Sequence, residues 1–267
     1  MSGLDNVIRA ANDHAKDGPA EPGSMLRVRD VTVRFGGFTA LDSVSFAVPA
    51  GGVVGIIGPN GAGKSTLVDA VCGFIRPTRG SVSLGATEMR QERPSSRAKL
   101  GLVRTFQTPR LFDSLAVAEH LQLVQADRFR GAFGLAPHSR HLLERLGLLD
   151  QAQERAQALA GGQRKLLDVA RAFAQQSLVT VLDEPVAGVA HHHHDAVAEI
   201  IRDVVADGTH SVVLVEHNIP FVEAVCDSVV VLDFGRVIAN GLWAEVKRNP
   251  SVVEAYLGRD GVKAAAQ

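Results

Sequence analysis

The loop at residues 58–66 carries the clearest chemistry in the sequence. It has the G-x-x-x-x-G-K-[ST] spacing that binds phosphate groups, with an apolar run (53–57) before it and a helical pattern (67–71) after it. Glycines let the backbone curl so that successive N–H groups point at phosphates, and the helix adds the positive end of its dipole. The alternative to a phosphate-binding loop is an ordinary glycine-rich turn. Such a turn would not require a strand before it and a helix after it. The predicted nucleotide-binding residues are Gly58, Pro59, Asn60, Gly61, Ala62, Gly63, Lys64, Ser65 and Thr66.

A pair of carboxylates supplies complementary chemistry. Asp183 and Glu184 follow the apolar run 179–182, and a buried strand that ends in an acid can present it to Mg²⁺ beside bound phosphates. Because adjacent strand residues face opposite ways, Asp183 is assigned to the metal and Glu184 to the general base that polarises the attacking water. Lys64 would then reach the β- and γ-phosphates, and Ser65 would place its hydroxyl on Mg²⁺. The alternative is two solvated acids at a strand end.

A second glycine-containing helix start lies upstream of the carboxylates. Gly161 and Gly162 follow Ala160 and open a helical pattern at 164–173 that has an apolar face. Such a start is again an anion site, here together with Gln163. One nucleotide can contact both helix starts only if two chains meet head to tail, so the sequence predicts a dimer.

Three isolated residues are further candidates. Gln107 lies where the loop-bearing core gives way to helical sequence, so its amide could touch Mg²⁺ or water when nucleotide closes the site. His217 follows a buried strand at its carboxyl end, where ligands gather in open α/β sheets. Phe35 precedes the turn Gly36-Gly37 and could stack on a base. Taken alone, a lone histidine is more often structural or solvated, and a lone phenylalanine is more often core.

The elements around these residues predict an α/β fold with a P-loop NTPase core. Near-continuous apolar runs at 179–182, 212–215 and 229–232 indicate strands buried on both faces, as in a mostly parallel sheet. The strand-like pattern at 26–48 predicts an N-terminal antiparallel β subdomain. Residues 111–173 have helical periodicity, which predicts an inserted α-helical subdomain.

The domain boundaries follow from composition. Residues 1–24, rich in Ala, Asp, Asn, Gly and Pro, predict a flexible leader. Residues 25–258 form one ATPase domain, with the helical subdomain at about 108–175, and residues 259–267 form a flexible tail.

Charge and cysteine content exclude several classes of protein. The 28 Lys+Arg nearly balance the 29 Asp+Glu, so no basic surface calls for nucleic acid. Cys72 and Cys226 lack metal-ligand spacing and read as buried free thiols of a reducing compartment. No segment approaches the ~20 apolar residues of a membrane span, so any membrane role must act through a partner.

In their order along the chain, these motifs resemble the nucleotide-binding subunit of ABC transporters over residues 26–258. The resemblance implies a base-stacking Phe35, a Q-loop glutamine at Gln107 that contributes to Mg²⁺ and water binding, and a switch histidine at His217. It also implies a signature at 159–163 and a D-loop at about 187–190.

Within that family the chain looks like the ATPases of branched-chain amino-acid importers. The resemblance rests on Arg104-Thr105-Phe106-Gln107, on Glu216-His217-Asn218 and on the ending 253–258. Urea or amide importers and the lipopolysaccharide-export ATPase share part of this pattern. The Arg-Thr-Phe-Gln sequence favours the amino-acid branch.

The resemblance implies ATP and Mg²⁺ as cofactors and a position at the cytoplasmic face of the cell membrane, peripheral to it. The implied partners are transmembrane permease subunits, a second ATP-binding subunit, identical or different, and an extracytoplasmic substrate-binding protein. No nucleic acid partner is expected.

The sequence departs from the family pattern in two of its motifs, and the stretch from Thr87 to Lys99 is short beside its relatives. Ala160 stands where the signature has Ser, and the D-loop Ala187-Gly188-Val189-Ala190 lacks a polar residue. Two other readings therefore stay open: an inactive cassette that binds ATP without turnover, and a soluble ABC-type ATPase of translation or DNA repair. The single cassette and the lack of heptads speak against the second, and Glu184 and His217 speak against the first.

The run His191–His194 invites a metal site. Neighbours within one helical turn cannot surround one metal ion, so a solvated helix start is favoured over a metal or pH-sensing site.

Overall fold

A six-stranded sheet forms the centre of the chain in the computed structural model, which describes residues 23–89, 92–125, 135–175 and 177–256. Its strand order is β10-β9-β3-β8-β7-β6. All neighbouring strands run parallel except β10, which pairs antiparallel with β9. The strands are β3 (Val53–Ile57), β6 (Leu102–Arg104), β7 (Val179–Asp183), β8 (Ser211–Val215), β9 (Ser228–Asp233) and β10 (Arg236–Gly241). The prediction of a mostly parallel sheet is confirmed.

Burial explains why these strands read as continuous apolar runs. Along β3, Val53 and Ile57 pack into the core on one face of the sheet, whereas Val54 and Ile56 pack into the core on the other. The residues of β8 and β9 alternate in the same way between the two cores. Because successive side chains point to opposite faces, a strand covered on both sides needs an apolar residue at every position.

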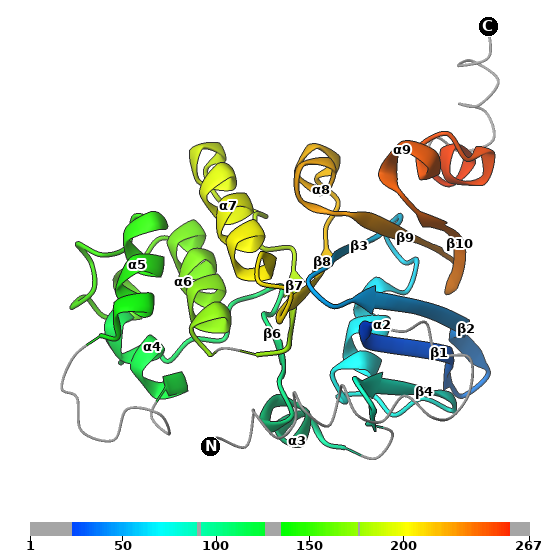
Figure 1. Cartoon of the computed structure of the whole chain (residues 1–267), viewed down its shortest axis with the longest axis horizontal. Coiled ribbons are helices and arrows are strands. Elements are labelled where there is room, and N and C mark those ends of the chain that lie inside the picture. The colour runs from blue at the N-terminus through cyan, green and yellow to red at the C-terminus, as the bar shows by residue number, and fades with distance from the viewer. Residues whose placement is uncertain (1–22, 90–91, 126–134, 176, 257–267) are drawn as a thin grey trace, which may run out of the picture.

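A second, antiparallel sheet packs beside the first and has the order β2-β1-β4-β5. Its strands are β1 (Ser24–Phe35), β2 (Phe38–Pro49), β4 (Arg79–Leu84) and β5 (Thr87–Glu88). Figure 1 shows this sheet at one end of the molecule, with α2 against it. The long hairpin of β1 and β2 was expected from the sequence. Sequence reasoning missed β4 and β5, which are short and lack a continuous apolar run.

Helices cover the parallel sheet and form a separate group at its far end (Figure 1). The helices are α2 (Lys64–Val71), α3 (Pro94–Lys99), α4 (Val117–Gln125), α5 (Pro137–Arg145), α6 (Gly161–Ala174), α7 (His194–Val205), α8 (Ile219–Val225) and α9 (Trp243–Val246), with short 3-10 turns at η1 (Ala156–Ala158) and η2 (His191–His193). Helices α4 and α5 both pack on α6. These three fall inside the range proposed for the helical subdomain, whose boundaries stay predictions, as do those of the leader and the tail, nearly all of which lie outside the described residues.

Helix α3, which lies between β5 and β6, holds the end of α2 in place. Arg97 of α3 is fully buried and donates to the carbonyl oxygens of Ala70 (3.0 Å) and Val71 at the end of α2. A guanidinium there satisfies carbonyls that have no partner in the helix and complements the negative end of its dipole. This arginine fixes α2, and therefore the loop before it, against the core.

The cysteines and the helix lengths agree with the sequence analysis. Both cysteines are free thiols, and burial raises the pKa of each to about 12, so neither is a ready nucleophile. Within the residues described, no helix has the length and apolar character that a membrane span requires.

Candidate active site

The loop 58–63 joins β3 to α2 at the carboxyl edge of the parallel sheet. Gly58 has φ +151°, and a Cβ there would lie 2.2 Å from the carbonyl oxygen of Leu232, so no other residue fits. Gly63 is the N-cap of α2 with φ +103°, a conformation that L-residues with side chains rarely adopt. The glycines that the sequence singled out are therefore the ones that the tight curl requires.

Lys64 lies inside this loop. Its Nζ donates to the carbonyl oxygens of Gly58 (2.7 Å) and Pro59 (3.0 Å). Burial lowers the pKa of Lys64, and the nearby carboxylates of Glu184 and Asp183 oppose that decrease. The ammonium group is therefore held against the loop carbonyls, within electrostatic reach of both acids.

Glu184 occupies a strained position directly after β7. Its φ is +50°, in the left-handed region, and its backbone N–H donates to the carbonyl of Val215 on β8 (2.9 Å). A glutamate held in this region stores strain of the kind that clusters at functional sites.

Two of the predicted residues converge on the Glu184 carboxylate from different parts of the chain. Gln107 Nε2 donates to Glu184 Oε2 at 3.2 Å, and His217 Nδ1 lies 3.5 Å from Glu184 Oε1. The Glu184 side chain is 18% exposed and that of His217 is 62% exposed, so the acid is partly covered while the histidine reaches toward solvent. This is the geometry of a base whose proton and water can be controlled by two neighbours.

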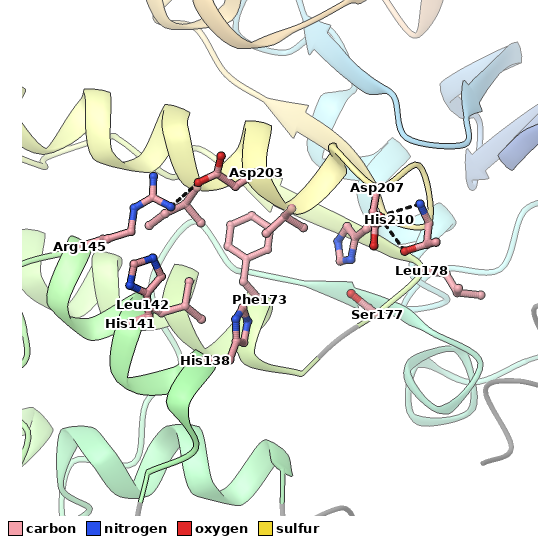
Figure 2. Close-up of a pocket in the computed structure, with 13 residues that line it drawn as sticks. His138, His141, Leu142, Arg145, Phe173, Ser177, Leu178, Asp203, Asp207 and His210 are labelled. Atoms are coloured by element: carbon pink, nitrogen blue, oxygen red, sulfur yellow. Dashed lines mark hydrogen bonds and ion pairs between the residues drawn. The ribbon is translucent and has the colours of Figure 1, made fainter. Parts of the chain in front are cut away.

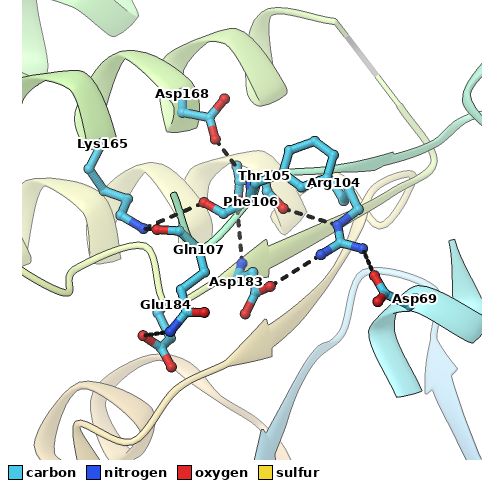
Figure 3. A network of polar contacts seen from close by, with 9 residues as sticks. All are labelled: Asp69, Arg104, Thr105, Phe106, Gln107, Lys165, Asp168, Asp183 and Glu184. Carbon is cyan, nitrogen blue, oxygen red and sulfur yellow. Dashed lines mark hydrogen bonds and ion pairs between the residues drawn. The ribbon is translucent and has the colours of Figure 1, made fainter. Parts of the chain in front are cut away.

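Asp183 points away from Glu184 into a partly buried ionic network (Figure 3). Arg104 contacts Asp183 Oδ2 at 3.2 Å with one nitrogen and Asp69 Oδ1 at 2.6 Å with another. Burial raises the pKa of the Asp183 carboxyl, and the Arg104 guanidinium opposes that rise. Thr105 Oγ1 accepts a hydrogen bond from the Asp183 N–H at 2.9 Å. Sequence reasoning did not assign Arg104 or Asp69 to the site.

The residues proposed for Mg²⁺ fit that ion chemically. Ser65 and Asp69 are four residues apart on α2 and therefore share a face of that helix, and Arg104 ties this face to Asp183. The hydroxyl of Ser65, the carboxylate of Asp183 and the amide of Gln107 are hard oxygen donors, as Mg²⁺ prefers. These three residues would hold the ion, whose chemistry is to neutralise charge on the phosphate oxygens.

Helix α6 holds the backbone beside Gln107. Lys165 donates to the carbonyl oxygens of Gln107 and Phe106, and Asp168 accepts the N–H of Phe106 at 3.2 Å (Figure 3). Arg171 in turn pairs with Asp168 at 2.5 Å. The segment that carries Gln107 is thus fastened to the helix that begins at Gly161.

The start of α6 lies apart from the loop at 58–66. Across the described ranges, no hydrogen bond or ion pair joins residues 160–163 to that loop. Gln163 caps its own helix, because its Oε1 accepts the N–H of Ala160 (3.0 Å) and its Nε2 donates to Gln151 (2.9 Å). Ala160 has no side-chain oxygen with which to complete the reciprocal cap. Within one chain, therefore, the two helix starts do not meet.

Three further residues, Phe35, Tyr256 and Glu216, differ in their surroundings. Phe35, at the end of β1, is 51% exposed and is therefore not a core residue. Burial raises the pKa of the Tyr256 hydroxyl, and a hydrogen bond from the Gly58 backbone opposes the rise. Glu216 is buried and accepts the N–H groups of Val186 (3.3 Å) and His217 (3.0 Å). An acid next to His217 was the only sequence signal for Glu216.

A cleft outside this site lies between α5, α7 and the segments that lead into β7 and β8, at the amino edge of the sheet (Figure 2). It measures about 470 Å³. No predicted site residue lines it. His210 on its wall is buried, which lowers its pKa to about 4, and its Nε2 pairs with Thr180 Oγ1 at 2.9 Å. The cleft is therefore not the nucleotide site.

The histidine run forms η2 and the first residue of α7. His191 and His194 stack with ring centroids 4.7 Å apart, and His194 Nε2 lies 3.1 Å from the carbonyl oxygen of Val189. Nowhere in the described residues do three or more His, Cys, Asp or Glu side chains gather as a metal site would require.

Family profiles match two parts of the chain. The profile described as "ABC transporter" matches residues 41–187, and the one described as "Branched-chain amino acid ATP-binding cassette transporter" matches residues 236–262.

Individual proteins match along most of the chain. It is 34% identical to the high-affinity branched-chain amino acid transport ATP-binding protein LivG of Escherichia coli, covering 88% of this chain and 98% of that protein. The corresponding protein BraF of Pseudomonas aeruginosa is 33% identical with the same coverage.

Solved structures agree with this relationship. The ADP conformation of an ATP-binding cassette of an ABC transporter superposes with a TM-score of 0.76 at 32% identity, covering 88% of this chain and 99% of that one. A nucleotide-free ATP-binding cassette from an ABC transporter gives a TM-score of 0.75 at 31% identity, covering 87% and 98%. The chain belongs to the ATP-binding subunits of ABC transporters, and it is an ATPase.

Proposed function

We propose that this ATPase energises the uptake of branched-chain amino acids by an ABC transporter. The solute is suggested by the names of the relatives, LivG and BraF, and by the matching profile at residues 236–262. In this proposal other subunits of the transporter recognise the solute. Its partners are then transmembrane permease subunits, with a substrate-binding protein on the opposite side of the membrane. The chain works at the cytoplasmic face, bound to the permease.

The catalytic roles rest on one observation, the convergence of Gln107 and His217 on the Glu184 carboxylate. In the proposed reaction Glu184 accepts the proton of the water that attacks the γ-phosphorus, while Lys64 and the backbone N–H groups of 58–66 hold the phosphates. Asp183, Ser65 and Gln107 would hold Mg²⁺. His217 orients Glu184 and the water, and Phe35 stacks on the adenine.

The proposal includes a dimer of two ATP-binding subunits, identical or different. The start of α6 is exposed and lies away from the loop 58–66 of its own chain. A second chain, placed head to tail, would bring Ala160, Gly161, Gly162 and Gln163 of one subunit to the nucleotide of the other. Hydrolysis then separates the two subunits. The contacts of Lys165 and Asp168 on α6 with the backbone of Phe106 and Gln107 carry the movement toward the permease.

The test is transport by the whole system in its own membrane. A strain that lacks this chain should lose uptake of labelled leucine, isoleucine and valine. Wild-type chain should restore uptake and co-purify with the permease subunits, whereas Glu184→Gln should co-purify without restoring it. Unchanged uptake in the deletion strain would show that branched-chain amino acids are not the solute. If the chain co-purifies with no membrane protein, the proposed role in transport is wrong.

A further inference from the structure

Arg104 is the last residue of β6, and its guanidinium lies between two carboxylates of different elements. One nitrogen contacts Asp69 Oδ1 on α2 at 2.6 Å, and the other contacts Asp183 Oδ2 at the end of β7 at 3.2 Å. The arginine side chain is 9% exposed and that of Asp183 is 7% exposed. Breaking such a buried pair is costly, because it leaves a charge without a partner.

The guanidinium is also fixed in orientation. Its centre lies 4.6 Å from the ring centroid of Phe106 and 5.2 Å from that of Phe74, and its Nε donates to the carbonyl oxygen of Thr105 at 3.2 Å. The shorter contact, with Asp69, anchors the group from the side away from Asp183. A planar fork held in this way can orient a carboxylate, which the point charge of a lysine cannot do equally well.

We propose that Arg104 is a positioning residue that holds Asp183 in the orientation needed for the Mg²⁺ of bound ATP. The inference rests on the proposed metal role of Asp183. Groups that orient a ligating carboxylate affect metal affinity strongly, typically about 10–100-fold on substitution. Arg104 also starts the segment whose last residue, Gln107, contacts Glu184, so one short segment touches both acids of the site.

The experiment measures how Mg²⁺ strengthens nucleotide binding, without turnover. A fluorescent ATP analogue is titrated into the purified full chain at increasing Mg²⁺ concentrations, and once with a chelator present. Arg104→Met is expected to raise the Mg²⁺ concentration for half-maximal effect about tenfold or more. Its affinity for the analogue in chelator should equal that of the wild type, because Lys64 and the loop 58–66 are intact.

Matched variants separate orientation from general damage. Arg110 also stacks on Phe106, at 4.2 Å, but contacts neither carboxylate in the described structure, so Arg110→Gln should keep the wild-type Mg²⁺ dependence. Arg104→Lys keeps the charge and loses the fork, and its shift should be intermediate. Asp69→Asn loosens the anchor without touching Asp183, and should give a smaller shift in the same direction.

The outcomes distinguish this inference from the proposed function. If Asp183→Asn keeps the wild-type Mg²⁺ dependence, the metal role of Asp183 is wrong, and the inference falls with it. If Asp183→Asn loses the dependence while the Arg104 and Asp69 variants keep it, only the positioning role is wrong. A lower half-maximal Mg²⁺ concentration in Arg104→Met would mean that arginine competes with the metal, which also overturns the inference. Should Arg104→Met not fold, Arg104→Lys and Asp69→Asn decide the matter alone.

Discussion

Helices α2 and α6 both begin after glycines, yet their surroundings differ. At α2 the chain itself closes around the glycines: a Cβ on Gly58 would lie 2.2 Å from Leu232 O, and one on Gly63 would lie 3.0 Å from Ala40 O. At α6 a Cβ on Gly161 would meet nothing within 4 Å. Gly58 and Gly63 are thus required by their own chain, whereas nothing in the described part of the chain requires Gly161.

The difference bears on where each site is completed. The loop before α2 holds Lys64 by two of its carbonyl oxygens, and Asp183 and Glu184 of the same chain lie close enough to affect the pKa of that lysine. The start of α6 offers backbone N–H groups to the outside, with only Gln163 returning to cap one of them. An unneeded glycine at an exposed anion site suggests that a group from outside the chain must approach closely there.

The largest effect is expected at the enclosed site, which consists of the loop 58–66, Asp183 and Glu184. Glu184→Gln keeps the shape and loses the base, so turnover should fall about 10²–10⁴-fold while ATP still binds. The ATP-bound dimer should then accumulate, which gel filtration with and without ATP would detect. Hydrolysis at the wild-type rate would show that another group takes the proton.

The second variant of the enclosed site tests binding instead of chemistry. Lys64→Ala removes a charged donor that would contact the phosphates, worth ~1.5–3 kcal/mol per hydrogen bond. Nucleotide affinity should fall about 10–100-fold, as measured by equilibrium titration. Arg34→Ala, which removes a positive charge from β1 outside the loop, is the control and should keep its affinity. Equal affinities in all three proteins would refute the role of the loop.

The enclosed site could be predicted because its signals are local. The glycine loop, the strand before it and the helix after it are contiguous in the sequence. Each central strand is a continuous apolar run because it is buried on both faces. The acids Asp183 and Glu184 end such a run, and so their place at the carboxyl edge followed from the pattern.

The contacts that tune the site were not predictable in the same way. Arg104 meets Asp69 and Asp183 across 35 and 79 residues of sequence, and Lys165 meets the Gln107 segment across 58. A single sequence gives no sign of which arginine will lie between which acids. The short strands β4, β5 and β6 were missed for a related reason, since their stability comes from neighbours instead of from their own patterns.

Two glycine variants test whether a group from outside the chain approaches the start of α6. Gly161→Ala has room in this chain and adds a helix former, so the melting temperature should stay equal or rise slightly. Turnover should nevertheless drop about tenfold, a change of ~1.4 kcal/mol, because the added methyl obstructs the close approach of the other subunit's nucleotide. Stability is read by thermal melting and turnover by phosphate release.

The neighbouring variant serves as the control. Gly162→Ala would place a Cβ 2.9 Å from the carbonyl oxygen of Gly188 in the D-loop of the same chain, so it should lower the melting temperature as well as turnover. If Gly161→Ala leaves turnover unchanged, nothing approaches that helix start, and the head-to-tail dimer loses its support.

The smallest effect is expected at Ala160, where the exposed start of α6 lacks a side-chain hydroxyl. Ala160 is exposed, has an extended backbone, and has no side-chain oxygen of its own with which to cap the N–H groups of α6. Ala160→Ser supplies a hydroxyl that can cap the helix in the isolated chain and donate to the γ-phosphate in the dimer.

Capping alone would raise stability by ~0.5–2 kcal/mol without changing turnover. A donor to phosphate would raise turnover or tighten the ATP-bound dimer by up to about tenfold, within the ~1.5–3 kcal/mol of one charged hydrogen bond. Melting curves and ATP-dependent dimerisation, measured on the same samples, therefore separate the two uses of the hydroxyl. A gain in stability with no gain in dimerisation or turnover would mean that position 160 caps its helix and does not face phosphate.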